Sequence, residues 1–312
     1  MACLAAAAAP AACGGQEQAP TQRQPATAAR PAPAPVAAGA ALCARPLRSR
    51  VTGRVSSPAA TELSGVVLSR SRPGVLWTHN DSGDGPRLLA VRASGEAVAD
   101  VALAGAENVD WEDIAIGPDG ALLVGDIGDN DARRESIVVY RVPEPAGTGT
   151  GEAAVAARHE LRYPDGARDA EALLFDRFTG ALVIVTKSFG GEAGVYAARR
   201  PSSRAVTTLR RSATIRLGPL AAVTAGDVSA DGRTIALRTY EHAYVWRRRA
   251  GEAMTATMRR RPCRADADLS AEGQAEALAL TRDGRAFVTV PEGPRPALRR
   301  YVASAAASGS PR

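Results

Sequence analysis

Residues 110–128 read DWEDIAIGPDGALLVGDIG, and this stretch contains the pattern that decides the fold. Acidic residues lead into a short apolar segment, a Pro-Asp-Gly turn follows, and a second apolar segment ends in another acidic residue. Gly and Asp supply the backbone angles that a tight hairpin needs. The stretch therefore predicts two antiparallel strands joined by a short turn.

The same pattern occurs five times along the chain. Each copy begins with polar or acidic residues that lead into an apolar strand, and second and third apolar segments follow. The five first strands are ELSGVVLS (62–69), DWEDIAIG (110–117), DAEALLFD (169–176), TAGDVSAD (224–231) and QAEALALT (274–281). An internal repeat of this kind governs the interpretation of the whole fold.

The period of the repeat matches a propeller blade. When Ser64, Glu112, Glu171, Gly226 and Glu276 are taken as equivalent, the copies are 48, 59, 55 and 50 residues apart, which leaves room for four strands in each. We therefore predict an all-β fold, a five-bladed β-propeller of four-stranded blades. A β-sandwich has similar strand spacing, but it would not explain five copies of one motif.

The ends of the chain are expected to close this ring. The outer strands of blades one to four are predicted near residues 96–103, 153–162, 205–217 and 253–260. The fifth blade runs out of chain after its third strand, so residues 47–55 are expected to supply its outer strand. This pairing would remove the open sheet edges that favour aggregation.

The first 13 residues are small and weakly apolar, and they end at Cys13. They resemble the end of a bacterial lipoprotein signal, in which the cysteine becomes lipidated; a plain secretory signal is the alternative. Residues 14–41 are rich in Pro and Ala and predict a disordered tether. The propeller domain is expected over 42–303, with a disordered tail over 304–312. The protein is therefore expected outside the cytoplasm, as a cell-surface lipoprotein or in secreted form.

Two cysteines, Cys43 and Cys263, remain beyond the signal-like segment. An oxidising compartment favours a disulfide between them, which would brace the seam between blades four and five. Nothing in the sequence shows that the two residues are close.

The charge pattern argues against nucleic-acid binding. The formal net charge is +6, but the basic residues are scattered and aromatic residues make up only 4% of the chain. A nucleic-acid binder gathers its basic residues into one patch with aromatic residues between them. We expect a monomer whose partner is a small molecule, a glycan or a protein, with membrane contact only through a lipid anchor.

Acidic residues are expected to converge on the channel. The first strand of each propeller blade lines the central channel, so Glu112, Glu171 and Glu276 would face one axis and repel one another unless a cation lies between them. Oxygen ligands suit Ca²⁺, and Ser64 and backbone carbonyls are expected to complete its shell. The alternative is that these glutamates bond backbone amides and that the channel holds only water.

Loops after the second strands are expected to open on the same face as the ring. They carry the residues predicted to bind a ligand at the channel mouth, which are Asp81, Asp84, Asp126, Asp129, Tyr240 and His242. The loop sequences HNDSGDG and GDIGDND also resemble small calcium loops, although Asx turns explain them equally well.

The strand openings resemble those of calcium-activated nucleotidases of the apyrase type, which are five-bladed propellers with a central Ca²⁺. The resemblance rests on ELS at 62–64, on Glu112 followed by LLVGDIG, and on the glutamates at 171 and 276. Gly226 departs from it, because the family has a second serine there. That ligand is then either missing or replaced by Thr224 or Asp227, and Asp227 is the replacement that we predict. The chain also looks, more loosely, like phytase-like and esterase-like propellers. The resemblance implies a central Ca²⁺ and hydrolysis of phosphate esters or esters.

Three functions are compatible with this sequence. The first is a calcium-stabilised, tethered propeller that binds a ligand without turning it over. The second is a metal-dependent hydrolase, with Asp110 or Asp113 as base and Lys187 or His79 neutralising an anionic substrate. The third is an interaction scaffold in the cell envelope. An anion hydrolase needs positive charge at the mouth, and its scarcity there favours binding.

Overall fold

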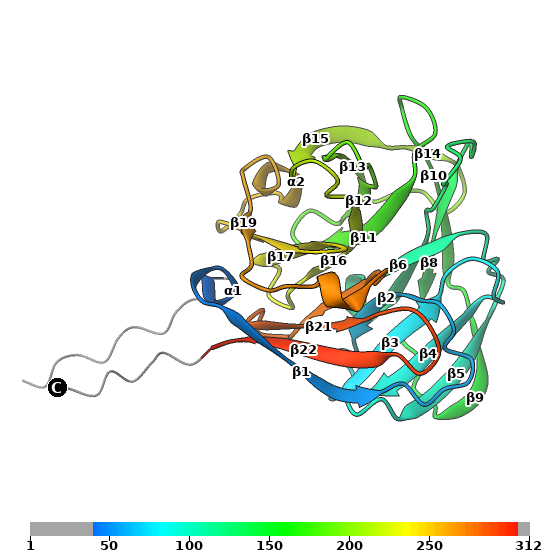
Figure 1. Cartoon of the computed structure of the whole chain (residues 1–312). Coiled ribbons are helices and arrows are strands. Elements are labelled where there is room, and N and C mark those ends of the chain that lie inside the picture. Colours follow the sequence, from blue (N-terminus) through cyan, green and yellow to red (C-terminus); the bar gives the residue numbers. More distant parts are fainter. Residues whose placement is uncertain (1–39, 305–312) are drawn as a thin grey trace, which may run out of the picture. The chain divides into compact units, whose positions relative to one another are not determined.

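The computed structural model describes residues 40–304, which form a ring of five β-sheets (Figure 1). The predicted all-β, five-bladed propeller is confirmed. Residues 1–39 and 305–312 lie outside the described part, and with them the predicted signal segment, Cys13 and nearly all of the predicted tether and tail. Within residues 40–304, no helix has the length and apolar character needed to cross a membrane.

Blades one and two each contain the four expected strands and a fifth that joins the outer edge in parallel. Blade one consists of β2 (Leu63–Leu68), β3 (Val75–Asn80), β4 (Arg87–Arg92), β5 (Ala97–Ala104) and β9 (Gly149–Ala154). Blade two consists of β6 (Trp111–Ile116), β7 (Leu122–Asp126), β8 (Ile137–Val142), β10 (Ala157–Arg162) and β14 (Thr207–Thr208). A short 3₁₀ turn, η1 (Pro118–Gly120), joins β6 to β7. In the sequence, β9 lies among the strands of blade two and β14 among those of blade three. Each pairs instead with the outer strand of the preceding blade, so these two strands link neighbouring blades.

Blades three and four have four strands each. Blade three consists of β11 (Ala170–Asp176), β12 (Ala181–Thr186), β13 (Glu192–Arg199) and β15 (Arg210–Arg216). Blade four consists of β16 (Val223–Val228), β17 (Thr234–Thr239), β18 (Ala243–Arg247) and β19 (Cys263–Arg264). The outer strand predicted near 253–260 is wrong, because that segment contains helix α2 (Met254–Thr257) and the strand comes later. Met254 and Met258 bury their side chains in the core between blades three and four, which explains why this apolar segment is a helical plug.

Blade five closes the ring by pairing the two ends of the domain, as predicted. It consists of β20 (Ala277–Leu280), β21 (Ala286–Val290), β22 (Ala297–Ala303) and β1 (Leu47–Arg54), and η2 (Ser270–Glu272) precedes it. Strand β1 pairs antiparallel with β22 from Leu47 to Arg54. The predicted disulfide is also confirmed, since Cys43 on α1 (Ala40–Ala44) is bonded to Cys263 across a sequence separation of 220 residues. The bond links the start of the domain to blade four and adds a covalent restraint at the seam.

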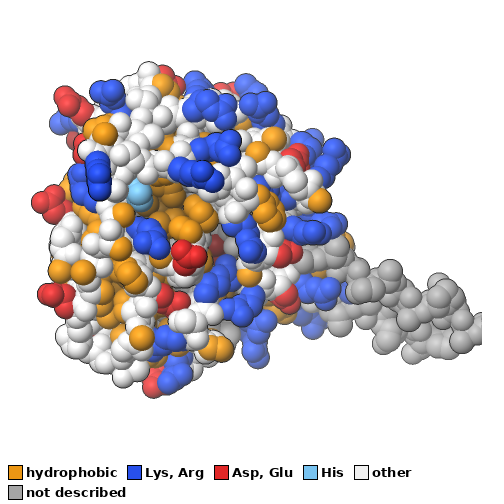
Figure 2. All heavy atoms as spheres, turned by 180° about the vertical axis from the view of Figure 1, so that it is seen from behind, with side chains coloured by type: hydrophobic (Ala, Val, Ile, Leu, Met, Phe, Trp, Pro, Cys, Tyr) orange, Lys and Arg blue, Asp and Glu red, His pale blue; other side chains and the backbone are white. Residues whose placement is uncertain are grey.

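Apolar side chains fill the space between neighbouring blades rather than one central core. Each of the five buried clusters joins two adjacent blades; Trp77 and Trp111, for example, lie in the cluster between blades one and two. This arrangement leaves the axis to the first strands, so the channel can be lined by polar groups. On the face shown in Figure 2, basic side chains are spread across the surface with acidic ones among them.

The backbone register corrects the alignment of blade four. Directly after each inner strand, a backbone amide donates a hydrogen bond across the hairpin to the second strand. This bond runs from Ser69 to Val75 in blade one and from Ser229 to Thr234 in blade four. Counting back from these equivalent pairs, the position of Ser64 in blade one is taken by Thr224 in blade four, two residues before Gly226. Thr224 also lies at a register irregularity like the one at Glu112 and Glu171. The ring is therefore Ser64, Glu112, Glu171, Thr224 and Glu276, with a hydroxyl or a carboxylate from every blade.

Candidate metal centre at the channel mouth

The ring residues lie at the start of the five inner strands and are buried. Glu112 is 2% exposed, Glu171 1% and Glu276 6%. Ser64 donates a hydrogen bond to the carbonyl of Glu112 at 2.6 Å, and Thr224 donates one to the carbonyl of Ala275 at 3.3 Å. Each hydroxyl thus donates its proton to the next blade and keeps its oxygen lone pairs available.

Lys187 neutralises one side of the ring. Its ammonium group bonds to Glu171 and lies 3.6 Å from Oε1 of Glu276. Tyr240 donates its hydroxyl proton to the same Glu276 oxygen at 2.8 Å, and the Lys187 ammonium lies 5.9 Å from the centre of the Tyr240 ring. These carboxylates raise the pKa of Lys187 above its usual range, although burial alone would lower it. The ammonium is therefore a fixed internal counter-ion for Glu171 and Glu276.

The other side of the ring gathers carboxylates around Glu112, and of these only Glu171 is paired with Lys187 among the described residues. Two groups of three have oxygen atoms within 4.8 Å of one another: Asp81, Asp110 and Glu112 form one, and Glu112, Asp169 and Glu171 form the other. Oε2 of Glu112 and Oε2 of Glu171 are buried and have no hydrogen-bond partner among residues 40–304. A buried carboxylate oxygen without a partner is costly, so this side is suited to a cation.

Burial and mutual repulsion raise the pKa values of these acids. Burial is the main cause for Glu112, and the nearby charge of Glu171 adds to it, so its pKa lies well above the ordinary value. Burial also raises the pKa of Asp81 to about 6 and that of Asp110 to about 6. Without a cation, the Glu112 side therefore retains protons in weakly acidic solution; a metal ion would displace them.

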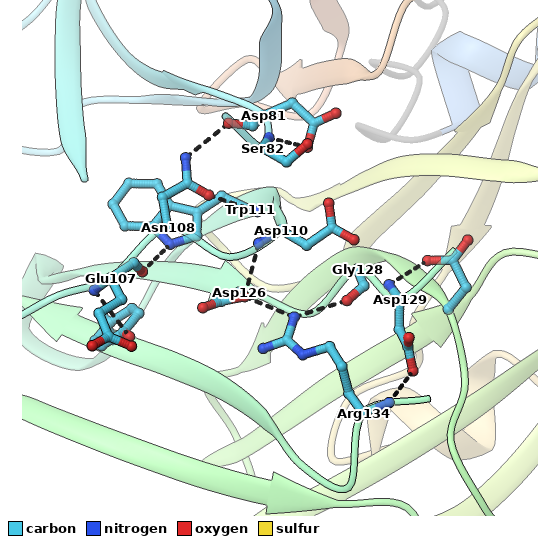
Figure 3. Close-up of polar contacts among 12 residues, drawn as sticks. Asp81, Ser82, Glu107, Asn108, Asp110, Trp111, Asp126, Gly128, Asp129 and Arg134 are labelled. Atoms are coloured by element: carbon cyan, nitrogen blue, oxygen red, sulfur yellow. Dashed lines mark hydrogen bonds and ion pairs between the residues drawn. The ribbon is translucent and has the colours of Figure 1, made fainter. Parts of the chain in front are cut away.

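The Gly-Asp-Ile-Gly segment at the end of β7, residues 125–128, leaves room for the acidic side chains. A Cβ atom on Gly128 would lie 2.3 Å from Oε1 of Glu112 and 2.5 Å from Oδ2 of Asp110, so no larger residue fits there without displacing both acids. The amide of Asp110 donates to Oδ1 of Asp126 at 3.1 Å (Figure 3). Arg134 bonds to that same oxygen and to the carbonyl of Gly128, both at 2.8 Å (Figure 3). These contacts fix the loop on which the site is built.

Two predicted site residues fasten blades together instead. Oδ1 of Asp113 accepts the amide of Ile114 at 2.9 Å, while Oδ2 accepts those of Leu173 at 2.9 Å and Gly226 at 3.2 Å. Asp113 thus joins blades two, three and four, and it is fully buried, away from any substrate at the mouth. Gly226 also serves the contact between blades: because it has no side chain, blades three and four can approach closely there.

Asp227 has a similar structural position. Its two oxygens accept the amides of Val228 and Leu280, each at 2.7 Å, which links blade four to blade five. It lies three residues beyond the ring position on β16 and contributes to neither acidic group at the mouth. Within the part of the chain that the structure describes, Thr224 is therefore a better fourth-blade ligand than Asp227.

His79 lies in the core and not at the mouth. Its ring is fully buried, its Nδ1 is 2.9 Å from the carbonyl of Asn80, and it packs edge-on against Trp111 with ring centres 5.5 Å apart. Burial lowers its pKa to about 4, so the ring is neutral near pH 7. A neutral, enclosed imidazole cannot neutralise an anionic ligand.

The predicted mouth residues divide into two groups. Asp81 and Tyr240 lie beside the ring acids, as described above, whereas Asp84, Asp126 and Asp129 organise their own loops. Asp84 accepts from Asn80 at 2.7 Å, and Asp129 accepts two backbone amides of its loop at 2.9 Å. His242 lies farther out on blade four, 3.4 Å from a guanidinium nitrogen of Arg264. Asp169 was missing from the predicted ligands, although its spacing two residues before Glu171 repeats that of Asp110 before Glu112.

The comparisons with known proteins identify no family. No family model matches the chain, and no curated protein matches it. Among solved structures, a protein from Bacteroides uniformis that is provisionally named a 6-phosphogluconolactonase is similar with a TM-score of 0.43 and 13% identity. The similarity covers 82% of this chain and 71% of that chain. It is too low to carry an argument about activity.

The raised pKa values predict a pH-dependent metal affinity. Because a metal binds the charged carboxylates, we expect affinity to fall as the pH drops through about 6, where Asp81 and Asp110 take up protons. In metal-free protein, protonation of these groups stabilises the fold, so their contribution is lost as the pH rises through about 6. Titration calorimetry of Ca²⁺ at several pH values, in buffers of different ionisation enthalpy, measures affinity and proton release together. An affinity that does not change with pH, with no proton release, would exclude these acids as ligands.

Proposed function

We propose that this protein is an exported five-bladed propeller that holds Ca²⁺ beside Glu112 and binds a ligand at the channel mouth. The observation that carries the proposal is the pair of buried, unpartnered oxygens on Glu112 and Glu171, with Asp81, Asp110 and Asp169 around them. All the donors are hard oxygens, which Ca²⁺ prefers. Ser64 and Thr224 offer further hydroxyl oxygens at the same level of the channel.

Export is supported by the disulfide. A bond between Cys43 and Cys263 persists in an oxidising compartment and is rare in the cytosol. A lipid anchor at Cys13 would keep the domain at the cell surface, and the Pro- and Ala-rich residues after it would act as the tether.

The charge at the mouth favours a ligand with hydroxyl groups over a phosphate ester. Lys187 is committed to Glu171 and Glu276, and Arg134 is committed to Asp126 at 2.8 Å. Neither cation is free to receive an anion, while Asp81 and Asp110 remain as hydrogen-bond acceptors beside the ion. A polyhydroxylated ligand such as a glycan would match this surface, and Ca²⁺ would supply further contacts to its oxygens.

The test is thermal unfolding of the full chain in EDTA and in millimolar Ca²⁺. A ligand that binds only the folded state stabilises it by about 2.7 kcal/mol at one hundred times its dissociation constant, so the melting temperature should rise clearly with Ca²⁺. Mg²⁺ at the same concentration is the control, because it demands a smaller, regular octahedral site. If Ca²⁺ causes no rise, the acidic groups are structural and the proposal fails.

Hydrolysis is the second candidate, and the position of Asp110 favours it. Asp110 is partly exposed at the mouth and belongs to the acidic group beside the proposed ion, where it can reach a water molecule. When bound, Ca²⁺ could polarise a substrate oxygen, while Asp110 would accept a proton from water. Screening phosphate esters, nucleotides and carboxylic esters with calcium tests this. Turnover that disappears in Asp110→Asn but persists in Asp84→Asn would favour the hydrolase.

A further inference from the structure

The opposite end of the channel carries arginines at equivalent positions of three blades. In each blade, one residue directly follows the last residue of the first strand that pairs with the second strand. This residue is Arg70 in blade one, Arg177 in blade three and Arg282 in blade five. The equivalent residues of the other two blades are Pro118 and Ala230. The repeat that brings glutamates together at one end of the inner strands therefore brings arginines together at the other.

These arginines share a large cavity. It has a volume of about 1330 Å³, and its lining includes the turns between first and second strands of all five blades. Six arginines line it, against three acidic residues, Asp119, Glu144 and Asp227. The carboxylate of Glu144 is occupied by Ser71 and Trp77, and that of Asp227 by two backbone amides. The cavity therefore has an excess of positive charge.

Hydrogen bonds hold two of the three guanidinium groups in place. Arg282 donates to the carbonyl of Arg70 at 2.7 Å, and Arg177 donates to the carbonyl of Ala230. Between residues 40 and 304, none of the three forms a salt bridge, and the guanidinium of Arg70 donates no hydrogen bond. Burial is the main cause that lowers the pKa of Arg70; the charges of Arg282 and Arg177 add to it, and the nearby charge of Asp227 partly offsets it. Because no described carboxylate lies within salt-bridge distance of Arg70, its hydrogen-bond donors remain available to an anion.

We propose that this arginine-lined cavity binds a small, multiply charged phosphate-bearing anion, at a site separate from the acidic mouth. The planar guanidinium donates parallel hydrogen bonds that match the oxygens of a phosphate group. Arg70 is the central contact, because it is partly buried and its donors are unused. Arg177 and Arg282 approach from the blades on either side of the axis, and the half-exposed ring of Phe178 adds an apolar wall.

The site is tested by titrating the full chain with pyrophosphate and with inorganic phosphate, in EDTA so that no calcium phosphate forms. We expect saturable binding of pyrophosphate that weakens with added salt, since the contacts are between charges. Arg70→Gln should weaken it by roughly tenfold or more, which is the effect of losing one charge-assisted bidentate contact. Arg92→Gln is the matched control, because Arg92 lies on β4 and pairs with Glu96 outside the cavity.

Two variants distinguish a specific anion site from general attraction to a basic surface. Because the guanidinium of Arg70 donates no hydrogen bond to any residue between 40 and 304, Arg70→Gln should melt at or above the temperature of the unchanged protein, so lost binding is not lost folding. Unchanged affinity in Arg70→Gln, or equal weakening in Arg92→Gln, overturns the proposal. So does Arg70-dependent binding to phosphatidylglycerol vesicles without binding of pyrophosphate, which would indicate a membrane surface. Glu112→Gln should bind pyrophosphate normally, so the result is independent of the calcium site.

Discussion

Glu112→Gln is expected to abolish most of the stabilisation by Ca²⁺ while leaving the metal-free protein at least as stable as before. The substitution keeps the shape of the side chain but removes its negative charge and replaces one carboxylate oxygen with an amide nitrogen, which does not ligate Ca²⁺. Mutation of residues that only orient metal ligands lowers metal affinity by about 10–100-fold. Loss of a ligand itself should therefore lower Ca²⁺ affinity by about 100-fold or more. At a fixed excess of Ca²⁺, that removes about 2.7 kcal/mol of stabilisation.

The stability of Glu112→Gln without metal distinguishes a metal-binding ring from a purely structural one. Glu112 is surrounded by Glu171, Asp81 and Asp110, and burial with these charges raises its pKa. Removing the acid should therefore relieve repulsion in EDTA. Unfolding of the variant with and without Ca²⁺ measures both effects, and Glu152→Gln on the exposed strand β9 is the control. Equal destabilisation in both conditions would mean that Glu112 only supports the structure.

The fold followed from the sequence because the repeat is carried by local chemistry. Gly and Asp turns mark each first hairpin, and alternation within the strands sets which side chains pack between blades. The exchange of strand β9 into blade one was not predictable, because its sequence, GTGEAA, has no apolar pattern and its place depends on an open edge of another blade. The helix at 254–257 was missed because Met254 and Met258 suit either a strand or a buried turn of helix.

The acidic ring was predictable in position but not in connections. Glu112, Glu171 and Glu276 occupy the same position in their repeats, which makes them recognisable from the sequence. In blade four, the acidic residue after Gly226 favours Gly226 as the equivalent position, whereas the register irregularity before Ala225 places Thr224 on the ring. The pairing of Lys187 with two glutamates joins residues from blades three and five, and no local pattern encodes such a contact. The same is true of Asp113, whose acidic neighbours suggested catalysis although its oxygens serve three blades.

Asp113→Ala is expected to destabilise the domain by about 3–9 kcal/mol, because it removes the acceptor for three buried backbone amides. Each buried donor that loses its partner costs about 1–3 kcal/mol, and a domain of ordinary stability has only about 5–15 kcal/mol in total. Asp113→Asn should cost less, since its amide oxygen can still accept the bonds from Leu173 and Gly226. Denaturant unfolding of both variants measures this order.

Asp110→Ala is the variant to compare with Asp113→Ala, because the two substitutions should affect metal-free stability and the response to Ca²⁺ differently. The Asp110 side chain is partly exposed and belongs to the acidic group at the mouth, so its loss should reduce the response to Ca²⁺ with little change in metal-free stability. A catalytic Asp113 would show the reverse of the expected pattern: Asp113→Ala would fold with normal stability and lose only turnover. If instead Asp113→Ala unfolds early and Asp110→Ala does not, the two neighbouring acids have separate roles, one fastening the blades and the other forming the site that those blades position.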